Sequence, residues 1–157
     1  LQQAGLDYEL ALLGQRFRAV PAPLQAVMSD HAGSIVHAGF LPSRAEYFGV
    51  LHAADVVLST ALHEFQGLSV LEAVQAGCVP VVPDRLAYRE MYPARFRYRS
   101  LPDNAPGEAD AAASCILELA GVTRMPEPPD VSAYGAAQLA PAYRRMLHRV
   151  HAGRHSQ

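Results

Sequence analysis

The sequence has no lysine, few charged residues and only two cysteines among its 157 residues. All 13 basic residues are arginine, so no lysine is available for Schiff-base chemistry or for a P-loop. Cys78 and Cys115 cannot form a disulfide framework, which favours a reducing compartment and predicts a cytoplasmic protein. No apolar run approaches the roughly 18 residues of a transmembrane helix, and we expect neither secretion nor a membrane segment.

The composition is that of one folded domain. Hydrophobic residues make up 50% of the chain and charged residues 18%, which is too apolar for a disordered protein. The length suffices for a single compact domain with a sizeable core. The formal net charge is −2, so the chain as a whole does not have the composition of a polyanion-binding protein.

The first residues predict that the chain is part of a longer protein. Residues 1–5 have the pattern of the last turn of a helix that stops at Gly5, and a strand follows at once. A single helical turn is an improbable beginning for a fold. We therefore expect residues 1–152 to form a domain that is truncated at its N-terminus, followed by a frayed tail over residues 153–157.

Strand and helix patterns alternate along the chain. Continuous apolar runs predict strands at residues 8–13, 34–40, 55–60, 78–82 and 96–98, and helical spacing predicts helices at residues 21–32, 44–51, 69–76, 88–92, 109–119 and 136–150. This alternation is typical of an α/β fold, a Rossmann-like parallel sheet with helices on both faces. Ligands of such sheets bind at the edge formed by the carboxyl ends of the strands.

The loop after the third strand is the most informative segment. Glu64 lies in this loop, and Glu72 lies in the following helix, on the side away from the core. Gly67 allows close approach of the backbone to a ligand, and Ser69 is a candidate N-cap. The free N–H groups of the helix N-terminus suit a phosphate or sugar oxygens, and the Glu72 carboxylate suits a vicinal diol. Alternatively, Glu64 caps its own loop and Glu72 is a solvated helix residue.

The longer sequence pattern around these two glutamates favours the ligand-binding interpretation. Glu-x-x-Gly-Leu-x-x-x-Glu-Ala from Glu64, followed by Ala-Gly-x-x-Pro-Val-Val, resembles the donor-binding half of the retaining family-4 glycosyltransferases. That resemblance implies the C-terminal half of a GT-B fold. It also implies that Glu64 contacts the donor sugar as the catalytic glutamate and that Glu72 holds the ribose hydroxyls. The donor-binding loop implied by the resemblance comprises Phe65, Gln66, Gly67 and Leu68.

Two further segments fit the same family, and the resemblance covers residues 8–120. Gly39, Phe40 and Leu41 resemble the segment V-x-F-x-G-x-V, whose backbone contacts the nucleobase in the family. Gly14 matches the end of the strand that usually has the sequence V-x-G-x-G, although Arg16 replaces its second glycine.

Three strings point to a subgroup of this family. S-T-A-x-H-E-F over residues 59–65, G-x-L-P-S from Gly39 and L-x-Y-x-E-x-x-P from Leu86 look like the tRNA-queuosine mannosyltransferases. This resemblance implies retaining transfer of mannose from GDP-mannose to queuosine in the aspartate tRNA, without a cofactor or metal. It also implies that the tRNA binds mainly to an N-terminal domain and that the basic residues for the diphosphate lie upstream. We therefore expect the isolated chain to be inactive.

Other functions remain open at this stage. The chain could belong to another family-4 enzyme with a lipid or polysaccharide acceptor, or it could be a non-catalytic nucleotide-binding module. His63 and Glu64 do not indicate a zinc hydrolase, because H-E-x-x-H needs a second histidine where Gly67 stands. Residues 85–99 contain five arginines and three tyrosines, which favours either an RNA contact or an ordinary solvated face.

Overall fold

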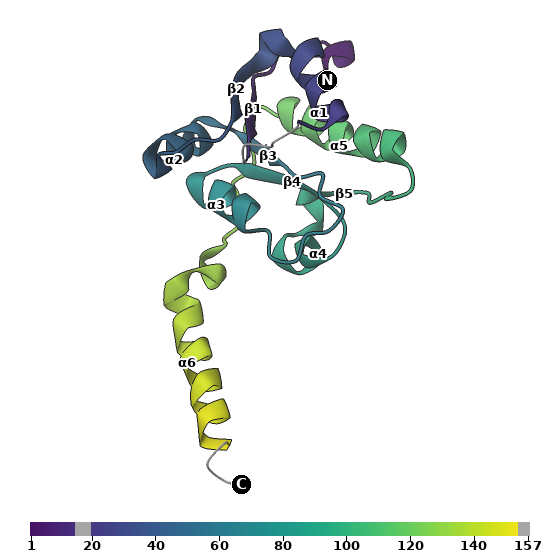
Figure 1. The fold of residues 1–157 in the computed structure, drawn as a ribbon. Coiled ribbons are helices and arrows are strands. Elements are labelled where there is room, and N and C mark those ends of the chain that lie inside the picture. Colours follow the sequence, from purple (N-terminus) through teal and green to yellow (C-terminus); the bar gives the residue numbers. More distant parts are fainter. Residues whose placement is uncertain (15–19, 154–157) are drawn as a thin grey trace.

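The computed structural model describes residues 1–14 and 20–153 (Figure 1). The strands are β1 (Leu10–Leu13), β2 (Ile35–Gly39), β3 (Val56–Leu58), β4 (Val79–Pro83) and β5 (Arg97–Tyr98). The helices are α1 (Ala22–Asp30), α2 (Arg44–Ala53), α3 (Leu68–Ala76), α4 (Ala87–Met91), α5 (Ala105–Ala120) and α6 (Ala136–Gly153). Short 3₁₀ turns are η1 (Gln2–Ala4), η2 (Ala32–Ser34), η3 (Ala94–Phe96) and η4 (Ser132–Tyr134).

The predicted α/β class is confirmed, because every strand pair is parallel and helices alternate with the strands. The sheet is divided into two hydrogen-bonded parts. β1 pairs with β2 alone, whereas β3, β4 and β5 form a three-stranded sheet with β4 in the middle. Leu13 of β1 packs beside Leu51, Ala73 and Cys78, so side chains join the two parts where backbone hydrogen bonds do not.

Strand β4 lies at the centre of the core, and all five of its residues are buried. Val82 belongs to a cluster with Val70 and Val74 of α3 and with residues of α4. Val81 belongs to a separate cluster with Tyr98 and with Ala112 of α5. The three-stranded sheet is therefore covered by α3 and α4 on one side and by α5 on the other. Burial on both faces explains why the sequence of β4 is a continuous apolar run.

Two prolines occur inside β4, and the neighbouring strands accommodate both. Alternate N–H groups of a strand point to opposite neighbouring strands. An N–H group at Pro80 would point toward β5, but β5 pairs only with the later residues Val82 and Pro83, so no hydrogen bond is lost there. An N–H group at Pro83 would point toward the β3 side of the strand, where Ser59 N–H donates to Val81 O at 3.0 Å. The next N–H in that ladder would come from Pro83, which has none. The Ser59 carbonyl accepts from the Tyr98 hydroxyl at 2.8 Å instead.

Helix ends agree with the sequence patterns in α2 and differ in α3. Ser43 caps α2, since its hydroxyl accepts from Glu46 N–H at 3.4 Å. The prediction that Ser69 caps the next helix is wrong, because α3 begins one residue earlier and its N-cap is Gly67. The left-handed conformation of Gly67, with φ of 61°, turns the chain into the helix before Ser69 is reached. Gly77 ends α3 as predicted.

Helix α6 extends away from the rest of the fold, as Figure 1 shows. It packs against the neighbouring turn η4. None of the helices in the described ranges is long and apolar enough to cross a membrane. Arg16 and residues 154–157 of the predicted tail lie outside the described residues, so the domain boundary remains a prediction.

Candidate functional site

The loop between β3 and α3 is held by the carboxylate of Glu64. Its Oε1 atom accepts hydrogen bonds from the backbone N–H groups of Gly67, at 2.7 Å, and Gln66, at 3.0 Å. These bonds lower the pKa of Glu64 below its ordinary value, because they stabilise the ionised carboxylate. Glu64 is therefore a charged group that closes its own loop at the carboxyl edge of the sheet, as the loop-capping alternative predicts.

The N-terminus of α3 adjoins this carboxylate. No side chain caps the helix, and the first N–H with a backbone acceptor is that of Leu71, which donates to Gly67 O at 2.8 Å. The preceding N–H groups in the first turn therefore remain available to an anion or to sugar oxygens. Phe65 and Leu68 flank them with side chains that are 78% and 62% exposed. Phe65 lies in the loop and Leu68 is the first residue of α3, so both side chains border these N–H groups.

Glu72 lies one turn further along α3 and faces α2. Its Oε2 atom accepts a hydrogen bond from the Tyr47 hydroxyl at 3.1 Å. Burial, and then this hydrogen bond to the carboxylate, raise the pKa of Tyr47 above its ordinary value. Glu72 is thus half-buried and oriented by a neighbouring helix, in contrast to a freely solvated helix residue. The sequence analysis did not assign a polar role to Tyr47, because its position fits the apolar face of α2.

The other predicted residues lie at the carboxyl ends of β1 and β2. Gly14 N–H donates to Gly39 O at 3.2 Å, which brings these two glycines together. Gly39 has a φ of 124°, a conformation that favours glycine, and the chain turns there out of β2. Phe40 is half exposed and Leu41 is partly buried. The predicted residues thus form two groups. Gly14 lies with residues 39–41 at the ends of β1 and β2, and Glu64 lies with the start of α3 after β3.

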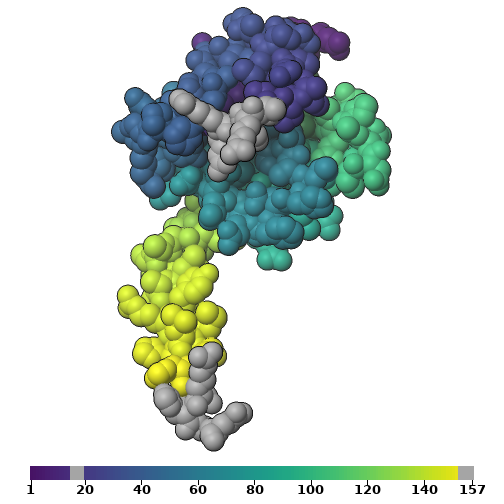
Figure 2. Space-filling model, viewed as in Figure 1, coloured from purple at the N-terminus to yellow at the C-terminus, as the bar shows by residue number. Residues whose placement is uncertain are grey.

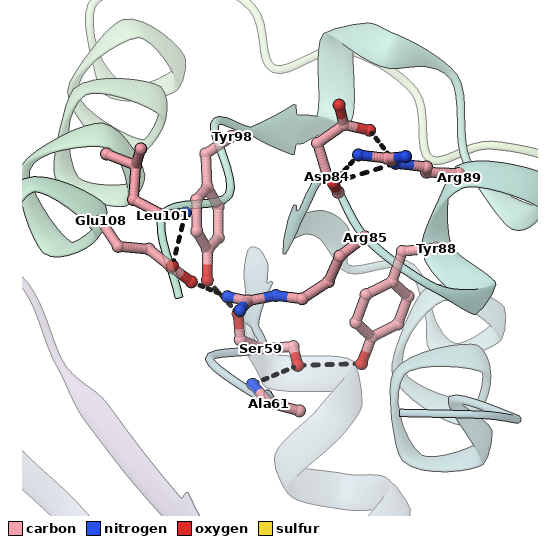
Figure 3. A network of polar contacts seen from close by, with 9 residues as sticks. All are labelled: Ser59, Ala61, Asp84, Arg85, Tyr88, Arg89, Tyr98, Leu101 and Glu108. Carbon is pink, nitrogen blue, oxygen red and sulfur yellow. Dashed lines mark hydrogen bonds and ion pairs between the residues drawn. The ribbon is translucent and has the colours of Figure 1, made fainter. Parts of the chain in front are cut away.

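A pair of buried hydroxyl groups, from Tyr88 and Ser59, lies beside the start of the loop after β3 (Figure 3). Tyr88 of α4 donates a hydrogen bond to Ser59 Oγ at 2.8 Å, and Ala61 N–H donates to the same oxygen at 3.3 Å. The Tyr88 ring also lies under Gly67, where an added Cβ would be 3.1 Å from Tyr88 Cε1. Tyr88 therefore contacts both ends of the loop. Two of the family-like strings include Ser59 and Tyr88, but neither string indicates that the two residues touch.

The three tyrosines and three of the five arginines in residues 85–99 make contacts within the fold. Tyr88, Tyr92 and Tyr98 are at most 2% exposed, so their rings are unavailable for stacking on bases. Arg85 forms a buried ion pair with Glu108 of α5, as Figure 3 shows. Asp84 forms ion pairs with Arg97, at 2.8 Å, and with Arg89, at 3.4 Å. Stacking of these tyrosines on RNA bases is therefore excluded, whereas Arg95 and Arg99 are exposed.

Two further findings concern metals and cavities. The described residues contain no group of three or more His, Cys, Asp or Glu side chains that could hold a metal ion. A cavity of about 330 Å³ is lined by His52, Asp55 and Gly77, among others. Asp55 and Gly77 precede β3 and β4, so this cavity lies at the opposite end of the strands from Glu64.

Comparison with known proteins finds a relative whose sequence is similar over much of this chain. The chain is 33% identical over 100 residues to a protein of Drosophila melanogaster named tRNA-queuosine alpha-mannosyltransferase. The match is to part of a glycosyltransferase. It covers 64% of this chain and 26% of the relative, so the chain spans about a quarter of the relative's length. No family model and no solved structure matches the chain.

Proposed function

We propose that this chain is the donor-binding part of a retaining glycosyltransferase that transfers mannose from GDP-mannose to queuosine in the aspartate tRNA. The observation that carries the proposal is the 33% identity with the Drosophila mannosyltransferase. The site geometry supports it, because two oriented carboxylates, Glu64 and Glu72, lie on either side of an uncapped helix N-terminus.

In this proposal each group has a chemical role. Glu64 Oε1 is occupied by the loop amides, which leaves Oε2 to accept hydrogen bonds from the donor sugar. The free N–H groups at the start of α3 stabilise the charge that develops on the departing diphosphate. Glu72 accepts hydrogen bonds from the ribose hydroxyls while Tyr47 holds its other oxygen. Charge-assisted bonds of this kind contribute about 1.5–3 kcal/mol each.

The remaining predicted positions bind the nucleotide. Phe65, Gln66, Gly67 and Leu68 border the sugar and diphosphate, and Gly39, Phe40 and Leu41 with Gly14 approach the base through their backbone. The backbone of Gly39 is already in the left-handed region, which opens the turn at the end of β2 for such an approach. The reaction proceeds in the cytoplasm and uses no metal or other cofactor.

The test is an assay of label transfer with the natural full-length protein. Radiolabelled GDP-mannose is incubated with queuosine-containing aspartate tRNA, and label in the tRNA is counted. Glu64→Gln and Glu72→Gln preserve an acceptor oxygen for the loop amides and for Tyr47, so they remove charge with little change in structure. We expect each to lower kcat/KM at least about tenfold, the equivalent of one lost charge-assisted bond.

Glu118→Gln is the matched control, because Glu118 is an exposed glutamate on α5, away from the loop. It should retain wild-type transfer. Label that stays out of the tRNA but enters a lipid or polysaccharide would indicate another family-4 enzyme. A protein that binds GDP-mannose without turning it over, with the biological role intact in Glu64→Gln, would indicate a non-catalytic nucleotide-binding module. The anomeric configuration of the product, determined by NMR, tests retention.

A further inference from the structure

Helix α6 separates the charges of this chain. All 15 carboxylates lie at or before Asp130, together with nine of the 13 arginines, whereas the other four arginines follow it. Residues 1–130 therefore carry a formal charge of −6 and residues 131–157 a charge of +4. The net charge of −2 conceals this asymmetry. A strongly basic segment attached to an acidic body is typical of a surface that meets a polyanion.

Within the described residues, the arginines of α6 have no acidic partner, in contrast to the arginines that pack around α4 and β5. Arg85, Arg89 and Arg97 pair with Glu108 or Asp84. Arg144, Arg145 and Arg149 are exposed, and no ion pair engages them within the described part of the chain. Figure 2 shows α6 projecting from the body. These three side chains are therefore free to contact phosphates.

The helix presents its cations and its apolar residues on different sides. The exposed apolar residues follow helical spacing and form one stripe, namely Leu139, Tyr143, Met146, Leu147 and Val150. At about 100° per residue, Arg145 lies roughly 140° around the helix from the centre of that stripe. Arg144 and Arg149 lie closer to the stripe, one on each side. The basic face therefore points outward when the apolar stripe is covered.

The spacing of the cations costs stability in the free helix. Arg145 and Arg149 are four residues apart, as are Arg144 and His148, so each pair brings two potential cations together on adjacent turns. Like charges at this spacing are unfavourable by a few tenths of a kcal/mol. A run of phosphates beside the helix relieves this repulsion, and the planar guanidinium groups suit paired phosphate oxygens.

We propose that the basic face of α6, formed by Arg144, Arg145 and Arg149, contacts the sugar–phosphate backbone of an RNA. The identity of the RNA as the tRNA acceptor rests on the proposed function. An anionic membrane is the alternative partner, because a helix with one apolar and one basic face can also lie at a lipid surface. RNA is favoured because the proposed function has a tRNA acceptor. The inference moves the RNA contact from residues 85–99 to the C-terminal helix.

The experiment measures the affinity of the natural full-length protein for aspartate tRNA by fluorescence anisotropy over a series of salt concentrations. The variant Arg144→Gln/Arg145→Gln/Arg149→Gln removes three exposed charges and leaves the apolar stripe intact. We expect affinity to fall at least about tenfold near physiological salt, and the slope of log K against log[salt] to decrease in magnitude by about two to three. Unchanged affinity and slope would overturn the proposal.

Two further variants separate phosphate contact from other effects. Arg95→Gln/Arg99→Gln/Arg124→Gln removes the same charge from exposed positions on the body and should change affinity less than about twofold. An equal loss in this control would mean that net charge alone is responsible, and would overturn the proposal. Lysine at all three α6 positions should retain most of the salt slope. If it binds as weakly as the glutamine variant, charge is not what α6 supplies.

Vesicles and transfer assays complete the test. If the α6 glutamine variant loses binding to vesicles of phosphatidylserine and phosphatidylcholine but keeps its tRNA affinity, the helix is a membrane contact and the proposal fails. If the wild type transfers mannose to tRNA and the α6 variant still binds tRNA normally, this inference is wrong and the proposed function stands. Wild-type protein that binds tRNA through α6 and transfers nothing contradicts the proposed function but not this inference.

Discussion

Tyr88 and Ser59 form a buried hydrogen bond of 2.8 Å that joins α4 to the first residue after β3. The same tyrosine ring lies against Gly67, at the other end of the loop that carries Glu64. One side chain from outside the loop therefore fixes both of its ends. Because the loop contains few buried apolar residues of its own, its conformation depends on this contact and on the hydrogen bonds of Glu64.

Replacement of Tyr88 by phenylalanine tests this dependence. Tyr88→Phe removes the hydroxyl and keeps the ring under Gly67, so the buried Ser59 hydroxyl loses a donor. We expect the free energy of unfolding to fall by about 1 kcal/mol. We also expect faster amide hydrogen exchange over residues 60–67 than in the wild type, while exchange in β4 changes little. Chemical denaturation and exchange monitored by mass spectrometry measure the two effects.

Tyr92 offers a matched control for this experiment. It is also a buried tyrosine of the α4 region, but its hydroxyl has no hydrogen-bond partner in the described structure, and burial raises its pKa. Tyr92→Phe should therefore be neutral or slightly stabilising, because it removes an unsatisfied polar group. Equal destabilisation by the two substitutions would show that the Tyr88–Ser59 bond contributes nothing specific.

The buried ion pair between Arg85 and Glu108 provides a second prediction. Both side chains are about nine-tenths buried, and Glu108 also accepts from Leu101 N–H at 2.7 Å. Glu108→Gln leaves the Arg85 charge buried without a counter-ion and should destabilise the fold by about 3–5 kcal/mol. The double variant Arg85→Met/Glu108→Gln should recover much of that loss, because no uncompensated charge remains. Urea denaturation of the wild type, the two single variants and the double variant gives the coupling energy, and purely additive effects would contradict the prediction.

The sequence predicted the fold class because its signals are local. Apolar runs such as 78–82 and the glycine stop at residue 77 depend on neighbours within a few residues, and both appear in the structure. Prolines are unfavourable inside a central strand, yet β4 contains two. They are tolerated because β5 begins further along and because the Tyr98 hydroxyl replaces a missing backbone donor. That replacement joins residues 39 positions apart, which no local pattern reveals.

The helix start between Glu64 and Glu72 was predicted, but the contacts that orient the two carboxylates were not. The spacing of Glu64 and Glu72 around a helix start was evident from the sequence. Their partners were not, because Tyr47 belongs to another helix and the amides that bind Glu64 carry no sequence signal. The N-cap was assigned to Ser69 from residue preference, whereas the left-handed conformation of Gly67 decides where α3 begins. Tertiary contacts and backbone conformation thus account for both differences.

Gly67 itself provides a third prediction. A Cβ at this position would lie 3.1 Å from Tyr88 Cε1, and the φ of 61° disfavours any L side chain. Gly67→Ala should destabilise the protein by about 1–2 kcal/mol. Gly49 is the control, since it lies in α2, is exposed and would place its Cβ in open space. Gly49→Ala should stabilise by about 0.5–1 kcal/mol in thermal or urea unfolding. Equal effects of the two substitutions would contradict the structural role of Gly67.

The hydrogen bonds to Glu64 give the loop a pH dependence of known sign. The pKa of Glu64 is lowered in the folded state, so its contribution to stability is present above the pKa of an unfolded glutamate. It is lost as the pH falls through the lower, folded pKa, where the carboxylate is protonated and the amides of Gln66 and Gly67 lose a charged acceptor. Amide chemical shifts of these two residues, followed by NMR, should therefore titrate together with a midpoint below the ordinary glutamate value.

The variant Glu64→Gln tests whether this titration belongs to Glu64. Glutamine keeps an acceptor oxygen but has no ionisable group, so the shifts of the Gln66 and Gly67 amides should become independent of pH across the acidic range. Glu118→Gln, on exposed α5, should leave the titration unchanged. If the Gly67 amide still titrates in Glu64→Gln, another acid controls the loop, and the assignment of Glu64 as its charged closing group is wrong. If it does not, the difference in unfolding free energy between wild type and Glu64→Gln should vanish as the pH falls below the folded pKa.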